Sequence, residues 1–182
     1  MKIANRLLAI FFAMQIAFAH AAAIDAGKSA VTATFKQIGV EVTAKFNSVS
    51  GAIDFDPANP ANGKAQIAVA LASFDLGEPE YNKEVQKKDW FNSAQFPQAT
   101  FVSSGIKAAG AGKLLVQGKL TIKGKALDVS LPVAFKQEGK ALVFEGQLPI
   151  KRLYFNIGEG EWKDTDTLAD AVVIKFKAVT SN

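Results

Sequence analysis

Apolar and polar residues alternate along most of this chain, and this alternation constrains the fold more than any other feature. From Leu114 to Ile122 every second residue is apolar or glycine, and most residues between them are polar. The same period of two recurs in 127–135, 142–150 and 172–177. A period of two places successive side chains on opposite faces of a β-strand. The second half of the chain is therefore predicted to form consecutive strands, each with one apolar face.

The first half of the chain shows shorter runs of the same kind. Alternation marks 31–36, 40–47, 53–56 and 66–71, and turn residues such as Gly51 separate these runs. Short turns between consecutive strands favour antiparallel pairing. The whole pattern predicts an all-β fold of about eight antiparallel strands. Because each strand has one apolar face, the sheet must either close into a barrel or pack as a sandwich.

Several positions on the predicted inward faces carry small residues. They are Ala33, Ala44, Gly118 and Gly146. Small inward residues either leave room for a ligand or allow larger neighbours to interdigitate across the interior. For an arbitrary β domain a filled core is the more common outcome, because protein interiors are usually close-packed.

The period changes in the middle of the chain. Residues 80–88 are polar and compatible with a helix, and Glu84 and Lys88 have the i,i+4 spacing of a helical ion pair. The following stretch, 90–101, contains four large aromatic rings, and its Pro97 argues against an uninterrupted central strand. We expect a short helix over one end of the sheet, followed by an aromatic cluster that either plugs the core or lines an apolar pocket.

The beginning of the chain has the parts of a secretory signal peptide. A short positive start precedes an uncharged apolar run, 7–19, and three alanines follow. The run is shorter than the roughly 20 residues that span a bilayer. We expect residues 1–23 to be removed, with cleavage after Ala23 or Ala21. Residues 24–182 would then be one exported domain, most simply in the periplasm.

Removal of this segment would limit the chemistry available to the protein. The single histidine, His20, lies within the segment, and the chain has no cysteine. Nucleophilic sites that need Cys or His, disulfides and His- or Cys-ligated metal sites are then excluded. The segment also holds Lys2 and Arg6, so its removal would leave 19 of the 21 basic residues and all 17 acidic residues. This balance and the scattered lysines argue against a nucleic-acid partner.

The aromatic cluster resembles a sequence pattern of the YceI-like family of periplasmic lipid- and polyisoprenoid-binding proteins. Other stretches resemble that family in the same order along the chain. The matching stretches are 35–40, 51–57, 72–75, 90–101, 118–124 and 152–158. The resemblance covers essentially all of 24–182. It implies a lipocalin-like antiparallel β-barrel whose interior holds an isoprenoid chain, such as that of a quinone or a polyprenyl lipid.

The resemblance also implies a carrier or store rather than an enzyme, with an isoprenoid lipid as bound ligand and no covalent cofactor. The chain departs from the family pattern at three places. Gln37 stands where many members have His, Tyr81 and Asn82 replace an Arg-Asp pair, and Asn156 replaces a Gly. These departures affect the expected chemistry of the lipid head group more than the apolar tunnel.

The candidate ligand-binding residues are mostly aromatic rings that would line the tunnel or, in an unrelated barrel, fill the core. They are Phe35, Gln37, Phe46, Phe74, Trp90, Phe91, Phe101, Phe144, Arg152 and Phe155. Gln37 has the parity of an inward residue and would be either a satisfied structural amide or a ligand contact. Arg152 would either bind a polar or anionic head group or form an ion pair at the rim. The acids available for that ion pair are Glu159, Glu161 and Asp164.

Two other functions compete with lipid carriage. One is a stress-related protein-interaction scaffold with a filled barrel. The other, less favoured, is a hydrolase that uses paired acids, but nothing in the sequence places two carboxylates across a cleft. The loop acids, Asp54 with Asp56 and Asp164 with Asp166, are more simply solvated. Transient contact with an inner-membrane protein and a homodimer remain open as protein partnerships.

Overall fold

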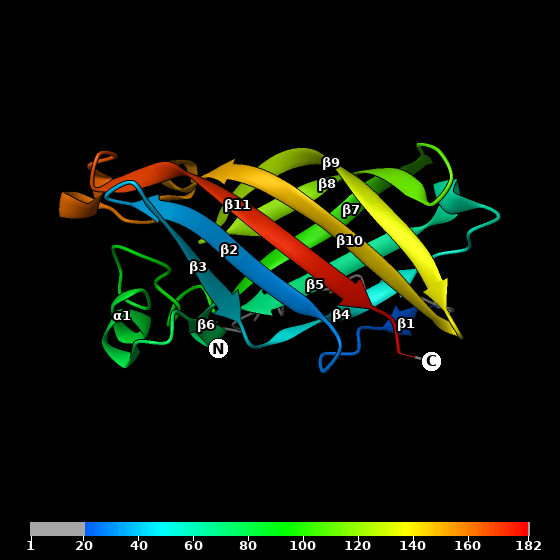
Figure 1. Cartoon of the computed structure of the whole chain (residues 1–182), viewed down its shortest axis with the longest axis horizontal. Helices are drawn as coiled ribbons and strands as arrows, with labels where there is room; N and C mark the ends of the chain where they lie inside the picture. Colours follow the sequence, from blue (N-terminus) through cyan, green and yellow to red (C-terminus); the bar gives the residue numbers. More distant parts are fainter. Residues whose placement is uncertain (1–20, 182) are drawn as a thin grey trace, which may run out of the picture.

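The computed structural model describes residues 21–181, in which one antiparallel sheet of 11 strands curls around a long interior (Figure 1). The prediction of an all-β, lipocalin-like barrel is therefore confirmed. In chain order the strands are β1 (Ala22–Ala23), β2 (Ala30–Gln37), β3 (Val40–Phe46), β4 (Val49–Asp54), β5 (Lys64–Ala70), β6 (Phe74–Asp75), β7 (Gln98–Ala108), β8 (Lys113–Ile122), β9 (Lys125–Glu138), β10 (Ala141–Lys151) and β11 (Leu168–Val179). Strands β1 and β6 have only two residues each, too few to produce a visible alternation.

The predicted signal peptide falls mostly on residues 1–20, which lie outside the described residues. Within 21–181, no helix has the length and apolar character needed to cross a membrane.

The predicted faces of the strands are best seen in β8. Leu114, Val116, Gly118, Leu120 and Ile122 are buried, and the residues between them are exposed or partly exposed. β8 pairs along its length with β7 and β9, so both of its edges are hydrogen-bonded within the sheet. Alternation in sequence has here become one wall of the apolar interior.

The two ends of the sheet meet where β3 runs directly into β4. The strand order is β1-β4-β5-β7-β8-β9-β10-β11-β2-β3-β6, so the terminal pairs of the sheet belong to these two consecutive strands. At one end of the interior, Ile24 joins β4 to the end of β11. Its amide donates to the Gly51 carbonyl, and it forms a bridge with Thr180.

Two of the small inward residues are covered by neighbouring rings. A Cβ atom on Gly118 would lie 2.5 Å from the tip of the Phe101 ring, and one on Gly146 would lie 2.7 Å from the tip of the Phe176 ring. These glycines therefore let large neighbours interdigitate, as one of the two sequence alternatives proposed, and the empty space lies elsewhere in the interior.

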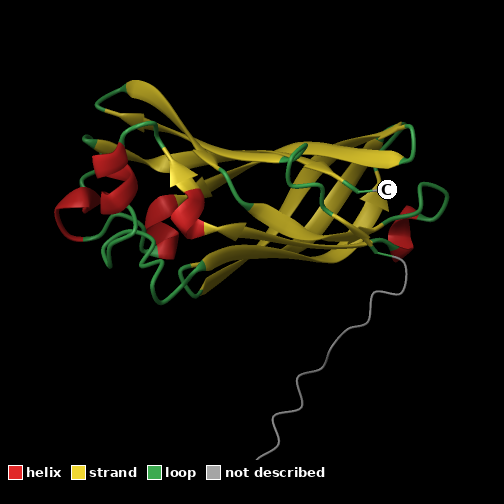
Figure 2. Cartoon of the chain, turned by 90° about the horizontal axis from the view of Figure 1, so that it is seen from below, coloured by secondary structure: helices red, strands yellow, loops and turns green. Residues whose placement is uncertain are grey.

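Helical turns gather at one end of the sheet, with the exception of η1 (Pro60–Asn62) at the other (Figure 2). The end with most of the helical turns carries η2 (Leu71–Ser73), α1 (Pro79–Glu84), η3 (Arg152–Phe155) and η4 (Gly160–Lys163). The predicted short helix before the aromatic cluster is therefore present as α1. The loop between β10 and β11 covers residues 152–167, because β11 begins at Leu168.

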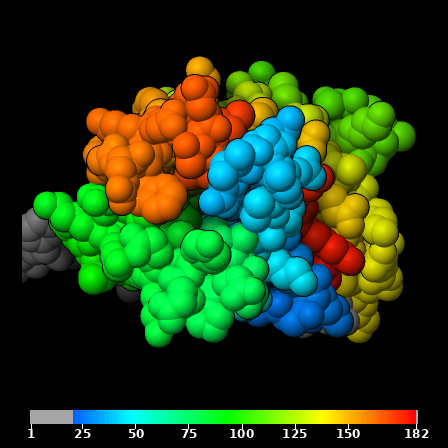
Figure 3. Space-filling view, turned by 60° about the vertical axis from the view of Figure 1, so that its left-hand side comes forward, coloured from blue at the N-terminus to red at the C-terminus, as the bar shows by residue number. Residues whose placement is uncertain are grey.

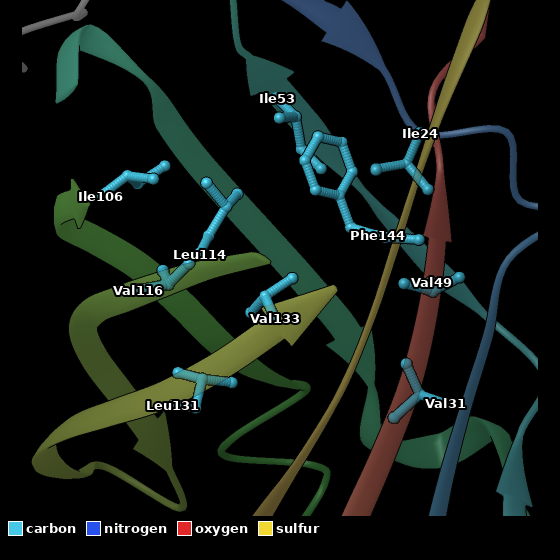
Figure 4. Close-up of a cluster of buried hydrophobic side chains, with 11 residues drawn as sticks. Ile24, Val31, Val49, Ile53, Ile106, Leu114, Val116, Leu131, Val133 and Phe144 are labelled. Carbon is cyan, nitrogen blue, oxygen red and sulfur yellow. The ribbon is translucent and has the colours of Figure 1, made fainter. Parts of the chain in front are cut away.

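The opposite end has a core made by the strands themselves (Figure 4). Phe144 packs edge-on against Phe55 with ring centroids 5.3 Å apart, and Phe55 packs in the same way against Phe135 at 5.1 Å. These rings close this end of the interior. We call it the closed end, and the end with the helical turns the mouth end.

Candidate functional site

The interior of the sheet contains two apolar cavities. The mouth cavity has a volume of about 410 Å³ and is lined from β2, β10 and β11, from the α1 segment and from the loop between β10 and β11. The deep cavity has a volume of about 180 Å³ and is lined only by residues within strands. Voids larger than a water molecule are few in ordinary cores, so this interior is unusually open. The mouth cavity is within the size range of small-molecule sites.

The two cavities share part of their walls. Phe46, Ile122 and Ile174 line both of them, from strands β3, β8 and β11. We call these three residues the waist. An apolar chain that passed the waist would run from the mouth end toward the closed end without meeting a charged group in the strand walls, except Lys177 at the edge of the deep cavity.

Most of the predicted site residues lie around these cavities. The mouth cavity contains Phe35, Gln37, Phe46, Phe74, Trp90, Phe91 and Arg152 in its wall, and the deep cavity contains Phe46, Phe101 and Phe144. Phe155 lines neither cavity. It is fully buried, and its ring packs edge-on against Tyr154 with centroids 5.0 Å apart. The role of all these residues in ligand binding stays a prediction.

The aromatic cluster forms a roof over the mouth cavity. Phe91 is buried and lies 5.5 Å from Phe74 and 6.1 Å from Phe46, measured between ring centroids. Trp90 reaches to the other side of the mouth, where its ring lies 5.2 Å from that of Trp162. The cluster therefore serves as a pocket wall and as a plug against solvent, which the sequence presented as alternatives.

The roof has a second half, the loop between β10 and β11, which we call the roof loop. Backbone hydrogen bonds join the aromatic cluster to this loop. The amides of Gly158 and Glu159 both donate to the carbonyl of Asp89, each at 2.8 Å. The indole nitrogen of Trp90 is buried without a hydrogen-bond partner among the described residues. A buried N–H that lacks a partner costs free energy. The roof thus holds at least one group that a small displacement or a water molecule would satisfy better.

Arg152 holds the roof loop from below. Its side chain is buried, and all five of its N–H donors are directed at backbone carbonyls. The acceptors are Ala169 at 3.1 Å, Ile157 at 2.9 Å, Gly158 at 3.0 Å, Trp162 at 2.7 Å and Leu168 at 2.7 Å. This arrangement leaves no donor for a lipid head group, and no ion pair joins Arg152 to an acid within the described residues. Its geometry is that of a structural cation.

Electrostatics at Arg152 agree with this role. Burial lowers the pKa of the guanidinium, and the nearby Asp170 carboxylate opposes this shift. Five carbonyl dipoles replace the water that the buried cation has lost, because buried charges need hydrogen-bonded compensation. Arg152 therefore exchanges solvation for the ordering of a loop whose only regular structure is the two short turns η3 and η4.

A lysine supports the same loop from the turn between β8 and β9. The side chain of Lys123 is only 7% exposed, and its ammonium donates to the Asn156 carbonyl at 2.6 Å and to Glu159 at 3.1 Å. Lys125 donates to the Asn156 side chain at 2.9 Å. The loop between β10 and β11 is thus held by cations from two elements.

The polar groups around the mouth are mixed and mostly uncharged or acidic. Gln37, Glu80, Tyr81 and Glu84 line the mouth cavity together with the occupied Arg152. Glu84 forms an ion pair with Lys87. Gln37 is half-buried at the end of β2. Figure 3 shows the recess at this end, bounded by the β2–β3 hairpin in blue, the helical segment in green and the β10–β11 loop in orange.

The loop acids considered for hydrolysis or cation binding serve their own loops. Asp164 accepts hydrogen bonds from the Asp166 amide and the Thr167 hydroxyl, which lower its pKa. Asp56 accepts from the Asn59 side chain and the Ala58 amide, with the same direction of shift. Within residues 21–181, no three His, Cys, Asp or Glu side chains are grouped as a metal site would require.

Among the lining residues of the mouth cavity that the sequence reasoning did not select as site residues are Tyr81, Trp162 and Ile174. Tyr81 was noted only as a departure from the family pattern. Trp162 lies in a polar loop between Glu161 and Lys163, and a lone tryptophan in such surroundings was the signal that could have found it. Ile174 follows from the alternation in the last strand, which predicted its face but not its place at the waist.

Known proteins are similar to this chain in sequence and in fold. The family model of YceI-like domains matches residues 23–180. A UPF0312 protein of Photorhabdus laumondii is 36% identical over 95 residues, which are 52% of this chain and 49% of that protein. The match therefore spans about half the length of this curated relative.

Solved structures match over more of their length. The crystal structure of Burkholderia cenocepacia BcnA has 51% sequence identity and a TM-score of 0.84, covering 87% of this chain and 99% of that one. A polyisoprenoid binding domain from Saccharophagus degradans has 18% identity and a TM-score of 0.67, covering 88% of this chain and 98% of that one. At this identity, the second likeness concerns the fold alone.

Proposed function

Because the chain belongs to the YceI-like domain family, we propose that it binds an isoprenoid lipid inside its curled sheet and acts as a carrier or store rather than as an enzyme. The observation that carries this proposal is the pair of adjacent apolar cavities, which share Phe46, Ile122 and Ile174 in their walls. Apolar cavities exclude water and accept apolar ligands. A filled protein-interaction scaffold would have no need of this space.

The chemistry of an isoprenoid suits this interior. Its tail has no hydrogen-bonding group, and the deep cavity offers almost none in return. Each buried methylene-sized unit contributes about 0.8 kcal/mol, before the cost of ordering the tail. The solved domain with the same fold from Saccharophagus degradans is named for polyisoprenoid binding, which adds support of a general kind.

The charges at the mouth favour a neutral head group. Glu80 and Glu84 line the mouth cavity, and the one cation in its wall, Arg152, already binds five carbonyls. A phosphate or diphosphate there would face carboxylates without a free cationic partner. A quinone has carbonyl acceptors and no charge. We therefore favour a prenylated quinone over a polyprenyl phosphate, and the predicted export would place the carrier in the periplasm.

The test is organic extraction of the purified protein followed by mass spectrometry. Protein expressed with its own N-terminal segment should yield a prenylated, uncharged lipid in stoichiometric amount. The extract should contain little polyprenyl phosphate. A matched sample of the variant Phe46→Trp, in which a larger ring narrows the waist, should carry less lipid.

Binding can also be followed without extraction. The chain has two tryptophans, Trp90 and Trp162, and both line the mouth cavity. Titration with a short-chain prenylated benzoquinone should quench their fluorescence in a saturable manner. If native extracts are repeatedly free of lipid and added prenylquinone causes no saturable quenching, the proposed function is wrong.

A further inference from the structure

The three most exposed large apolar side chains of residues 21–181 lie beside the mouth cavity. Ile38 is 74% exposed, Val40 is 66% exposed and Tyr81 is 56% exposed. Ile38 is the first residue of the two-residue turn of the β2–β3 hairpin, Val40 directly follows this turn, and Tyr81 belongs to α1. Figure 1 places both elements at the same end of the molecule. We call these three residues the rim.

Two contacts fix the rim to the entrance of the cavity. Gln37, next to Ile38, lines the mouth cavity, and so does Tyr81. The Ile38 amide donates to the Thr167 carbonyl at 2.9 Å, which ties the hairpin tip to the loop between β10 and β11. Of the three rim residues, Tyr81 lines the mouth cavity itself, and Ile38 and Val40 belong to the hairpin that contributes Gln37 to its wall.

The backbone at the tip is unfavourable for the residue it carries. Ile38 has φ +49° and Gly39 has φ +76°, so both central residues of this two-residue turn are left-handed. Such turns prefer Asn-Gly, and a β-branched residue at positive φ is a clear outlier. Ile38 gains no burial in return, since it is mostly exposed. Strain without a packing benefit is typical of functional positions.

We propose that the rim contacts the surface of a lipid bilayer, so that the isoprenoid passes between the bilayer and the mouth cavity without crossing water. This inference rests on the proposed function. An apolar tail that left a membrane through water would expose all of its surface, whereas a rim in contact with the bilayer shields it. A stable protein interface needs about 800 Å² on each partner. A hairpin tip and one tyrosine are too small for that but suit shallow insertion.

The charges beside the rim indicate how the contact is made. Lys36 and Lys83 lie near it, but so do Glu41 and Glu80, and all four are exposed. Strong electrostatic attachment to anionic lipid requires a cluster of basic residues. Contact here would depend on the apolar side chains, would be brief and would change little with salt.

The experiment measures transfer from vesicles in the full chain. Phosphatidylcholine vesicles carrying a short-chain prenylated benzoquinone are mixed with protein, and quenching of Trp90 and Trp162 reports entry into the mouth cavity. The test variant combines Ile38→Asn with Val40→Thr. Asn is favoured at this turn position, so the variant should fold at least as well as the wild type. We expect transfer to be slower by about tenfold, as the loss of two apolar contacts would give.

A matched control separates this effect from a general change of the surface. Val102 is 46% exposed and lies on β7, outside both cavity walls, so Val102→Thr should transfer at the wild-type rate. Each protein is also titrated with the same quinone injected from ethanol, without vesicles. Here the rim variant should match the wild type.

The two assays distinguish failure of the inference from failure of the proposed function. Equal transfer rates for the rim variant and the wild type, with normal vesicle-free binding, would overturn the bilayer contact and leave the hairpin tip to a protein partner. Absence of vesicle-free binding in the wild type would instead overturn the proposed function.

Discussion

The two ends of this interior are built in different ways. At the closed end, inward side chains of the strands pack across the barrel, and Phe144 of β10 meets Phe55, which directly follows β4. At the mouth end, the strands stop short and two irregular segments form a roof, joined by Trp90 and Trp162 and by bonds to the Asp89 carbonyl. The closed end is stabilised by many small apolar contacts. The mouth end also has an apolar cluster, which includes Phe74, Phe91 and Phe155, and its loop between β10 and β11 is held in addition by polar groups, Arg152 above all.

This difference suggests a division of labour. At the closed end the apolar contacts are spread over many strands, so the loss of one side chain leaves most of them in place. The loop between β10 and β11 lies outside the sheet and is held partly by hydrogen bonds from Arg152 and Lys123, and such a segment can open locally at a lower free-energy cost than a paired strand. A binding protein needs both properties, since its ligand must be held in the interior and must also enter it.

The largest expected effect comes from removing the cation of the roof. Arg152→Met would leave up to five carbonyls without a partner, and each buried unsatisfied group costs about 1–3 kcal/mol. With partial access of water, we expect a loss of about 4 kcal/mol in the free energy of unfolding, measured by urea denaturation. The exposed neighbour Lys151, changed to Met, is the control and should have little effect. Equal stability of the two variants would contradict the structural role of Arg152.

The second effect comes from a substitution in the closed end. Leu114 is 2% exposed, and Leu114→Ala should cost about 3 kcal/mol through the cavity it leaves. The adjacent Leu115 is 38% exposed on the outer face of β8, so Leu115→Ala should cost less than about 0.5 kcal/mol. Leu114→Ala should leave the rate of quinone entry unchanged. A faster entry in Leu114→Ala would show that the two ends are not independent.

The third effect concerns the waist between the ends. Phe46→Trp should obstruct the passage to the deep cavity and exclude about two methylene units of a long tail, which corresponds to about tenfold in affinity. Calorimetric titration should therefore show a loss of affinity for geranylgeraniol and a smaller loss of affinity for farnesol. Equal losses for both alcohols would mean that the tail does not pass the waist.

The smallest effect is a dependence of stability on pH. The Asp75 carboxylate at the mouth end accepts hydrogen bonds from the Gly77 amide and from the Asn82 and Asn47 side chains, which lower its pKa below 3.8. A lowered folded pKa stabilises the fold above the unfolded value, and this stabilisation is lost as pH falls through the folded pKa. Between pH 6 and pH 3, the urea midpoint of Asp75→Asn should fall slightly less than that of the wild type. An equal fall of the urea midpoint in both proteins would show that Asp75 does not contribute to this pH dependence.

The closed end could be predicted from the sequence, and the mouth end only in part. Alternation in β8 and its neighbours directly specifies which side chains face the interior, because the period of a strand is fixed. Parity also placed Gln37 toward the interior, but Val40, on the predicted inward face of β3, lies exposed at the hairpin tip. A strand pattern specifies a face and says nothing about where the barrel ends.

Arg152 illustrates the limit of such reasoning. Its inward position followed from the parity of Leu148 and Ile150, but its partners did not. They are carbonyls, which every residue type carries and no sequence pattern marks. Whether an inward arginine binds a ligand or a loop therefore depends on the path of the loop. Trp162 was missed for the same reason, since an irregular segment has no period from which its facing could be derived.

The position of β11 has a consequence for the order in which the chain can fold. This strand, the last one in the sequence, lies between β10 and β2, and the Val179 amide bonds to Ser29, 150 residues earlier. Until β11 has been synthesised, β2 lacks its neighbour on one side, and the β2–β3 hairpin is not joined to β10. Such long-range pairing is slow and leaves strand edges unpaired during folding. We expect the nascent chain to depend on chaperones until its final residues are available.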